Sequence, residues 1–401
     1  MRRTILILAS LVGSVQAQTV SWGKAAPLRE IPDTIALRYP SVVISDDTTF
    51  VAGNHFPSDV DRVAARRRLV IARSPGGMLP IPNGAFDFAF PHLARDRRGL
   101  LHLVWAEFAD SSGSLMAWMT PPATLWHSKY ANGRWSSPKK IFTGRMTWSG
   151  DGRSMTTDST GNVHIAFPAL LPGGPFAVVY IRIDSSGPVA EQHLSPGAGY
   201  ASITALTRDS LLIAYSTSDS LTPKGGSSIF VRVSSDGGRS WAPSTAIVRS
   251  DHRNGSAPLV ERTLTGLDAF WVESSRSSDG RSVLRRFSTR TTTGPWTEIA
   301  PAYAIEGAPV RVVSAGVVCR SYAAIIETLN GSPNDASIRL VAVAVRNGRS
   351  SATRLFQDLD GAMAVGIGAD RGQIRVIFAG IRHGELRAFP ATATGRACQT
   401  M

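Results

Sequence analysis

Apolar and polar residues alternate along most of this chain in short runs, which are separated by residues that favour turns. The run Val163–Phe167 is one example, and the runs end at Gly, Pro, Asn or Asp. Period-two alternation predicts β-strands, and no segment has the sustained i, i+3, i+4 apolar spacing of an amphipathic helix. The 37 glycines and 24 prolines agree with many short strands joined by turns. We therefore expect an all-β fold.

A unit of strand, turn and strand recurs along the chain. Its clearest copies span residues 92–105 and 154–167, where a turn with Asp and Gly separates two apolar runs. Counting weaker copies, the first turns fall near residues 47, 96, 158, 209, 266, 316 and 370. A period of about fifty residues fits four short strands with their turns, as in a propeller blade. These seven copies predict a β-propeller of four-stranded blades in a closed ring.

The last copy is short, ending near residues 385–389, so it lacks room for an outer strand. The N-terminal segment 28–37 is a candidate for that strand. Pairing the two ends of the chain would close the ring and remove its exposed edges.

One turn between outer strands is much better defined than the others. Residues 234–241 read Ser-Ser-Asp-Gly-Gly-Arg-Ser-Trp, with glycines that accept positive φ and an Asp that binds nearby backbone amides. The pattern resembles the Asp-box of the sialidase (BNR-repeat) β-propellers, with Ser where that family usually has Thr. The resemblance implies a sialidase-like propeller. Family members have six blades, so six and seven both stay open. The box shapes a turn and is no indication of catalysis.

A second resemblance lies at the start of the first inner strand. Leu37–Ser41 reads Leu-Arg-Tyr-Pro-Ser and is similar to the Phe-Arg-Ile-Pro motif of sialidases. The resemblance implies that Arg38 belongs to three arginines that hold the substrate carboxylate, which a planar guanidinium matches with two hydrogen bonds. Arg153, Arg262 and Arg311 stand near later inner strands and are the candidates for the other two. The alternative is that Arg38 only lines the central channel.

The family's acid/base aspartate would come from the loop after the first blade's second strand. Asp59 and Asp61 occupy that loop, where a carboxyl of raised pKa would protonate a leaving oxygen. The alternative is that both only form turns.

The nucleophile of the family is a Tyr activated by a Glu. Tyr200 and Glu273 are the candidates, although the family's Tyr lies near the end of the ring and no Tyr follows Tyr322 here. Glu107, Glu273 and Glu327 each end a second strand, which indicates a shared structural role. The catalytic set is therefore incomplete in the sequence.

The first 17 residues have the pattern of a signal peptide. Arg2 and Arg3 precede an apolar stretch that ends in Val15–Ala17, a small-x-small cleavage site. We expect a secreted or periplasmic mature domain spanning residues 18–401, and a retained N-terminal anchor is the alternative. The apolar stretch is shorter than the ~20 residues that span a bilayer, so we expect no membrane insertion.

The chain carries a net charge of +13, and its positive residues are dispersed without a basic tail. This distribution argues against nucleic acid as a partner and favours acidic sugars, while biased codon usage is the alternative cause. Cys319 and Cys398 either pair in an oxidising compartment or stay free. His102 and His164 recur at equivalent positions with no third ligand, which favours packing. We expect no metal, no cofactor and a monomer.

Three functions stay open from the sequence. The first is a secreted propeller that recognises glycans, with acidic sugars as ligands and no assigned catalysis. The second is an active exo-sialidase, a retaining glycoside hydrolase that uses the residues named above. The third is a structural or protein-binding propeller of the cell envelope. A shared fold does not choose among them.

Overall fold

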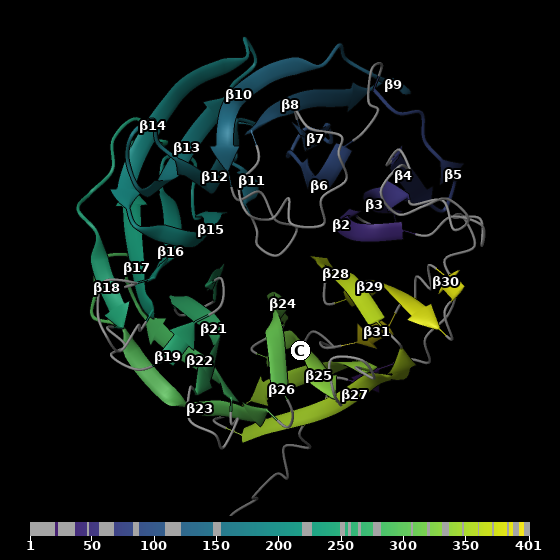
Figure 1. Ribbon diagram of the computed structural model, residues 1–401, viewed down its shortest axis with the longest axis vertical. Coiled ribbons are helices and arrows are strands. Elements are labelled where there is room, and N and C mark those ends of the chain that lie inside the picture. Colours follow the sequence, from purple (N-terminus) through teal and green to yellow (C-terminus); the bar gives the residue numbers. More distant parts are fainter. Residues whose placement is uncertain are drawn as a thin grey trace, which may run out of the picture.

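The computed structural model describes strands and turns in segments of the chain between residues 21 and 396 (Figure 1). The described segments are 21–22, 37–45, 48–55, 68–82, 88–108, 122–146, 154–218, 227–248, 253–255, 258–263, 266–275, 282–305, 308–318, 321–330, 337–346, 349–359, 361–370, 373–382, 385–387 and 393–396. Side chains are described only between residues 41 and 299. Within these segments every regular element is a β-strand, which confirms the all-β prediction. None of them contains a helix suited to crossing a membrane.

The strands form antiparallel sheets in which chain neighbours pair with each other. The first sheet contains β2 (Leu37–Ser45), β3 (Thr48–His55), β4 (Arg68–Ser74) and β5 (Gly77–Met78). A nine-stranded sheet follows, with β6 (Phe88–Arg95), β7 (Leu101–Phe108), β8 (Pro122–Ala131), β9 (Arg134–Trp135), β10 (Lys139–Met146), β11 (Met155–Thr157), β12 (Val163–Leu170), β13 (Phe176–Ile183) and β14 (Pro188–Pro196). Only two residue pairs, between β10 and β12, join its two halves.

Four further sheets complete the described strands. One contains β15 (Ala198–Ala205), β16 (Leu211–Ser218), β17 (Ser227–Ser234) and β18 (Thr245–Val248). The next contains β19 (Arg253–Gly255), β20 (Leu259–Arg262), β21 (Leu267–Ser275), β22 (Ser282–Thr289) and β23 (Thr297–Ile305). Then come β24 (Ala308–Val318), β25 (Ser321–Asn330), β26 (Ser337–Arg346) and β27 (Arg349–Leu359). The last contains β28 (Gly361–Asp370), β29 (Gln373–Arg382), β30 (Glu385–Arg387), β31 (Ala393–Arg396) and β1 (Ser21–Trp22).

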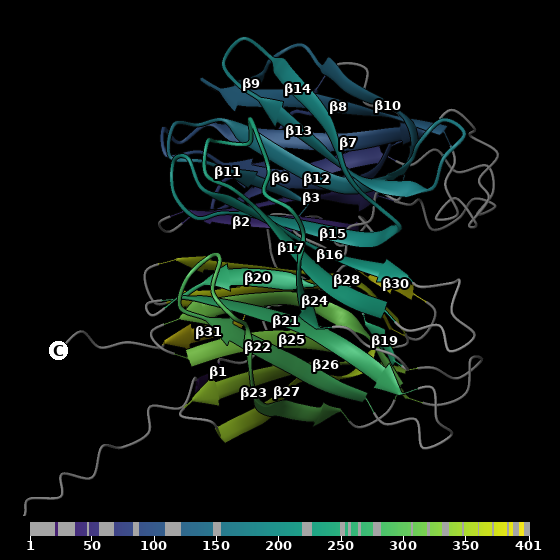
Figure 2. The same ribbon diagram turned by 90° about the vertical axis from the view of Figure 1, so that its left-hand side faces the viewer.

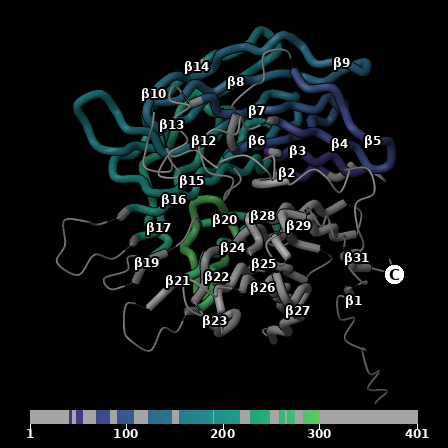
Figure 3. The backbone as a smooth tube through the Cα atoms, turned by 45° about the vertical axis from the view of Figure 1, so that its right-hand side comes forward, coloured from purple at the N-terminus to yellow at the C-terminus, as the bar shows by residue number. Residues whose placement is uncertain are grey.

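The sheets follow one another in chain order around a common centre (Figure 1). Strands β2, β24 and β28 lie nearest the centre, while β5 and β27 lie at the periphery. Figure 2 gives the view from the side, and Figure 3 traces the same course of the backbone as a tube. An N-terminal strand, β1, pairs with β31 of the last sheet, with Ser21 opposite Arg396. Residues 28–36 of the segment expected to supply such a strand lie outside the described residues.

The core lies between neighbouring sheets, which explains why the second strands are apolar at nearly every position. Trp105 on β7 packs with Leu69 and Ile71 of the first sheet. Its neighbour Val104 points to the other face and packs with Ile165 on β12. Because alternate residues of a strand face opposite sides, a strand covered on both faces needs apolar residues throughout.

The Asp-box is a turn held by its own short side chains. The Asp236 carboxylate accepts hydrogen bonds from the amides of Arg239 and Ser240, each at 2.9 Å. Ser234 Oγ accepts one from the Gly238 amide at 2.8 Å. Gly237 and Gly238 have φ of +69° and +82°, a region in which residues other than glycine are strained. The box therefore has the turn-forming role that its sequence indicates.

Candidate functional site

The residues expected to form a site are only partly within the described segments. Asp59, Asp61 and Arg153 lie outside them. Arg38 and Arg311 lie on strands β2 and β24, of which the structure describes the backbone. Tyr200, Arg262 and Glu273 are described in full.

Strand register brings four of these residues to one end of their sheets. Arg38, Tyr200 and Arg311 stand near the beginnings of first strands, opposite Asn54, Ser216 and Glu327 near the ends of second strands. Glu273 lies near the end of another second strand, β21. The turn between the first and second strands is at the other end of each sheet. We call the end that carries these four residues the Arg38 end.

Each of the three first-strand residues stands next to an irregularity in pairing. Register shifts occur between Arg38 and Ser41, between Ala198 and Tyr200, and between Pro309 and Arg311. Such bulges change the direction of side chains and are common at the rims of barrels and beside active sites. Three first strands therefore share a backbone irregularity at the Arg38 end.

Arg262 lies at the opposite end. It closes β20 next to the first turn, where it pairs with Leu267. Its guanidinium Nη1 donates a hydrogen bond to the Leu206 carbonyl of the preceding sheet at 2.6 Å. Arg262 thus joins two sheets, and the register does not bring it together with Arg38 and Arg311.

The second-strand glutamates bind residues of the adjacent third strand. Glu273 is buried, and its Oε2 lies 3.2 Å from Arg285 Nε. Glu107 accepts a hydrogen bond from Trp126 Nε1 at 2.7 Å. Both partners stand two residues beyond the position directly opposite the glutamate. The shared structural role indicated by the sequence is therefore present for these two. Tyr200, which is 40% exposed, lies on a different sheet from Glu273.

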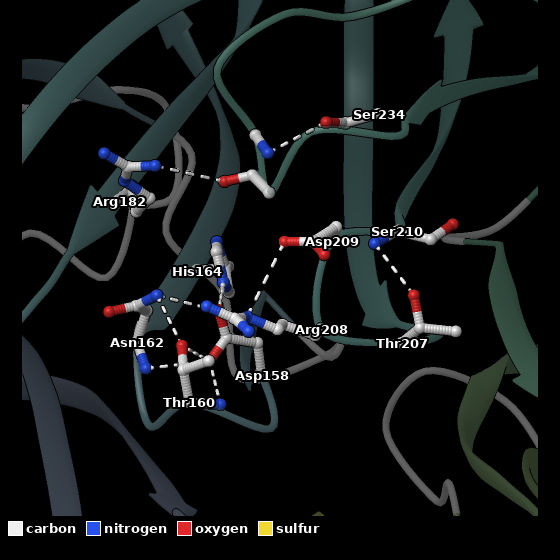
Figure 4. Close-up of polar contacts among 12 residues, drawn as sticks. Asp158, Thr160, Asn162, His164, Arg182, Thr207, Arg208, Asp209, Ser210 and Ser234 are labelled. Carbon is white, nitrogen blue, oxygen red and sulfur yellow. Dashed lines mark hydrogen bonds and ion pairs between the residues drawn. The ribbon is translucent and has the colours of Figure 1, made fainter.

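A buried chain of polar groups has the composition of a proton relay. Asp158 accepts hydrogen bonds from Thr160 and Asn162, and its Oδ2 lies 3.1 Å from His164 Nε2 (Figure 4). His164 Nδ1 is hydrogen-bonded to the Tyr180 hydroxyl at 2.8 Å. Burial favours a higher pKa for Asp158, but hydrogen bonds from His164, Thr160 and Asn162 outweigh it and lower the pKa below its usual range.

The end of this chain is closed to solvent. Tyr180 is fully buried, and burial raises the pKa of its hydroxyl above the usual value. A Cβ on Gly238 of the Asp-box would overlap the Tyr180 hydroxyl, so the phenol end lies directly against that glycine. The Trp241 ring packs edge-on against Tyr180 with centroids 4.9 Å apart. The Asp158–His164–Tyr180 chain therefore connects two sheets, and a substrate has no access to its phenol.

Other repeats have a matching pair at the same register position. His102 Nδ1 and His127 Nε2 are 3.1 Å apart, and Asp268 Oδ2 lies 2.8 Å from Arg286 Nε. The sheet between has Leu212 and Val231 there, packed in the apolar core. These contacts support the interpretation of His102 and His164 as packing residues.

Long polar side chains add a second connection between consecutive repeats. Lys129 and Lys139 donate to the carbonyls of Asp184 and Ser186 in the next outer turn. At the equivalent positions one repeat later, Arg182 donates to Gly237 O and Gln192 donates to Gly238 O, at 3.4 and 2.9 Å. The Asp-box is thus held from outside by the preceding sheet as well as by its own side chains.

An open groove of about 460 Å³ lies between β10, the end of β12 and β14. Phe142, Ala169, Leu170 and Leu171 supply apolar surface, while Arg145, Glu191 and His193 supply charged or polar groups. Its volume lies within the ~300–1,000 Å³ typical of small-molecule sites. Arg145 stands opposite Leu170, the last residue of a second strand, so the groove lies at the Arg38 end of its sheet. No sequence motif marks these residues, because the groove forms between strands of two consecutive repeats.

Neither protein-family models nor curated proteins match this chain. Among solved structures, the polysaccharide lyase Uly1 superposes with a TM-score of 0.50 at 10% identity, covering 96% of this chain and 93% of Uly1. The β-propeller domain of the Trilobed protease from Pyrococcus furiosus superposes with a TM-score of 0.51 at 10% identity, covering 88% of this chain and 92% of that domain. The fold is a β-propeller. Trypanosoma rangeli sialidase matches more weakly, with a TM-score of 0.45 at 10% identity over 93% of this chain and 57% of the sialidase. These likenesses concern the fold.

Proposed function

We propose that this chain is a glycan-recognising β-propeller whose ligands carry acidic groups. The observation that carries the proposal is the placement of Arg38 and Arg311 at the same end of sheets next to the centre, each beside a register shift. Guanidinium groups bind carboxylates and sulfates through paired hydrogen bonds. Two arginines at the same end of the propeller, on the two sheets that flank the β28 sheet, would hold one acidic sugar. Arg153, which precedes β11, is the candidate for a third contact.

Two broader features support this ligand class. The net charge of +13 attracts anionic polymers through the summed field of the protein. A polysaccharide lyase has a similar fold over nearly all of the chain, so a propeller of this size is compatible with long glycan ligands. Fold alone does not assign an activity, and the proposal is therefore recognition rather than a named reaction.

The finer architecture belongs to the same proposal. We infer seven four-stranded blades, with the nine-stranded sheet counting as two blades joined by the short β10–β12 pairing. The β1–β31 pairing, which joins the two ends of the chain, supports a closed ring. Residues 1–17 are an export signal, and the single domain 18–401 works outside the cytoplasm as a monomer.

The test is binding of the purified chain to an array of acidic and neutral glycans. We expect acidic glycans to bind at least tenfold more tightly, with an affinity that falls as salt screens the charges. Arg38→Ala should weaken this binding. Arg134→Ala, which removes an equal charge from the exposed first residue of β9, should not. Equal binding of neutral glycans, or equal effects of the two substitutions, would contradict the proposal.

A hydrolysis assay separates recognition from catalysis. In the exo-sialidase alternative, Asp59 or Asp61 would protonate the leaving group and Tyr200 would be the nucleophile. Glu273 is already paired with Arg285, so a different carboxylate would have to activate Tyr200. Release of a fluorogenic aglycone from a sialoside would make the chain an enzyme. Blank results in both assays would favour the structural or protein-binding alternative.

A further inference from the structure

We propose that the groove between β10 and β14 is a separate site for an acidic sugar unit, so that the natural ligand is an extended polysaccharide. The ligand class rests on the proposed function, but the groove and its residues are independent of Arg38 and Arg311. The groove lies between the outer strands of two consecutive repeats, both within the nine-stranded sheet, and away from the strands nearest the centre.

The floor of the groove is suited to the apolar face of a sugar ring. Phe142 lies on β10 and packs edge-on against Phe167 with centroids 5.1 Å apart, which fixes its orientation. A Cβ on Gly144 would come within 2.9 Å of Phe142 Cζ, so the ring lies over the glycine along the strand. The half-buried aromatic ring and the adjacent Leu171 therefore form a fixed apolar surface. Aromatic rings with an exposed face contact the C–H groups of sugars in this way.

The cationic side of the groove is available for a ligand. Arg145 is exposed, and within the described segments its guanidinium makes no ion pair. A guanidinium in this state presents its donor fork to a carboxylate or a sulfate. The single positive charge of Arg145 therefore favours a ligand with an anionic group at one edge.

The opposite side of the groove is suited to hydroxyl groups. Glu191 and His193 project from β14 as an exposed pair, with His193 Nε2 3.0 Å from Glu191 Oε1. The second carboxylate oxygen of Glu191 is left to accept hydrogen bonds. A suitable ligand carries an anionic group that binds Arg145 and hydroxyl groups that donate hydrogen bonds to Glu191. An acidic sugar has both kinds of group. A simple anion such as phosphate would gain nothing from the apolar floor and would be repelled by the Glu191 carboxylate.

The position of the groove favours a polymer. Both the groove and the residues near the centre lie at the Arg38 end of their sheets. A chain of sugars that occupies both would gain affinity from the linkage itself, because the second contact becomes intramolecular. A single sugar unit would occupy only one of the two sites and would show no such gain.

The experiment measures dissociation constants of the full chain for three probes of equal charge by calorimetry. The probes are an oligouronide, a sulfated neutral oligosaccharide and a polyglutamate peptide. We expect Arg145→Ala to weaken binding of at least one oligosaccharide about tenfold. The oligosaccharide that loses affinity identifies carboxylate or sulfate as the recognised group. Glu191→Gln should weaken the same probe, and Arg134→Ala should leave it unchanged.

Several outcomes would overturn the inference. Equal losses in Arg145→Ala and Arg134→Ala would mean that only net charge matters. Polyglutamate binding that equals oligosaccharide binding and depends on Arg145 would make the groove a plain anion site. An oligosaccharide affinity unchanged by Arg145→Ala would exclude the groove. If Arg145→Ala weakens oligosaccharide binding and Arg38→Ala does not, the groove remains a binding site and the proposed site at Arg38 is contradicted. The two proposals can therefore fail separately.

Discussion

The contact between the Asp-box and the preceding sheet makes a sharp prediction for Gly238→Ala. The new Cβ would overlap the Tyr180 hydroxyl and would lie 2.5 Å from Tyr180 Cζ, at a backbone φ of +82°. The left-handed backbone costs about 1–2 kcal/mol for a residue with a Cβ. Overpacking against a buried side chain adds about 1–3 kcal/mol. We therefore expect the free energy of unfolding to fall by roughly 2–5 kcal/mol.

Gly237→Ala is the matched control in the same turn. Gly237 has a φ of +69°, but its Cβ would come no closer than 3.9 Å to a neighbouring atom, Asp209 Oδ1. This substitution should cost only the backbone term of about 1–2 kcal/mol. The difference between the two variants isolates the contact with Tyr180.

The assay is urea unfolding followed by tryptophan fluorescence, with Trp241 reporting beside the turn. Tyr180 cannot easily move aside, because it is held by His164 at 2.8 Å and by the edge-on Trp241 ring. Equal destabilisation by Gly237→Ala and Gly238→Ala would refute the reasoning. It would mean that the phenol does not press against the Asp-box, and that the polar chain from Asp158 does not connect the two sheets.

Two further predictions concern the buried polar groups. Burial lowers the pKa of His102 to about 4 and the pKa of His127 to about 3. The charge of Lys129 lowers both pKa values further. Asp96 opposes the shift at His102, and Lys139 adds to the shift at His127. The unfolded chain binds protons on these histidines below pH ~6.5, so stability should fall as the pH drops from 6.5 towards 4, by about 1 kcal/mol per pH unit for each histidine. Urea midpoints at several pH values test this dependence of stability on pH. The slope should become shallower in His127→Leu, and an unchanged slope would contradict the prediction. Glu273→Gln should lower stability by roughly 1–2 kcal/mol, because it removes the buried carboxylate of the two that Arg285 contacts, while Glu298 stays paired with the guanidinium at 2.9 Å. Glycan binding should be unchanged in that variant; lost binding at an unchanged urea midpoint would instead place Glu273 in the ligand site.

The strand pattern, the repeats and the Asp-box could be predicted from the sequence because each depends on neighbours in the chain. The nearly continuous apolar run Val163–Phe167 reflects a strand that is buried on both faces. The turn at Ser234–Trp241 is held by hydrogen bonds within eight residues, so its residues alone specify it. The packing roles of His102 and His164 followed from their equivalent places in two repeats.

The candidate sites depended on the tertiary structure, because they bring together residues from different repeats. Arg262 has the same type and a similar local pattern as Arg311, and only strand register puts the two at opposite ends of their sheets. In the sequence Glu273 is a candidate catalytic carboxylate, but in the structure Arg285 of the third strand forms an ion pair with it. Arg145, Glu191 and His193 belong to no motif and meet only because two consecutive repeats lie side by side within the nine-stranded sheet. A linear sequence specifies which faces are buried, whereas the groups that meet across those faces are decided by the packing of the sheets.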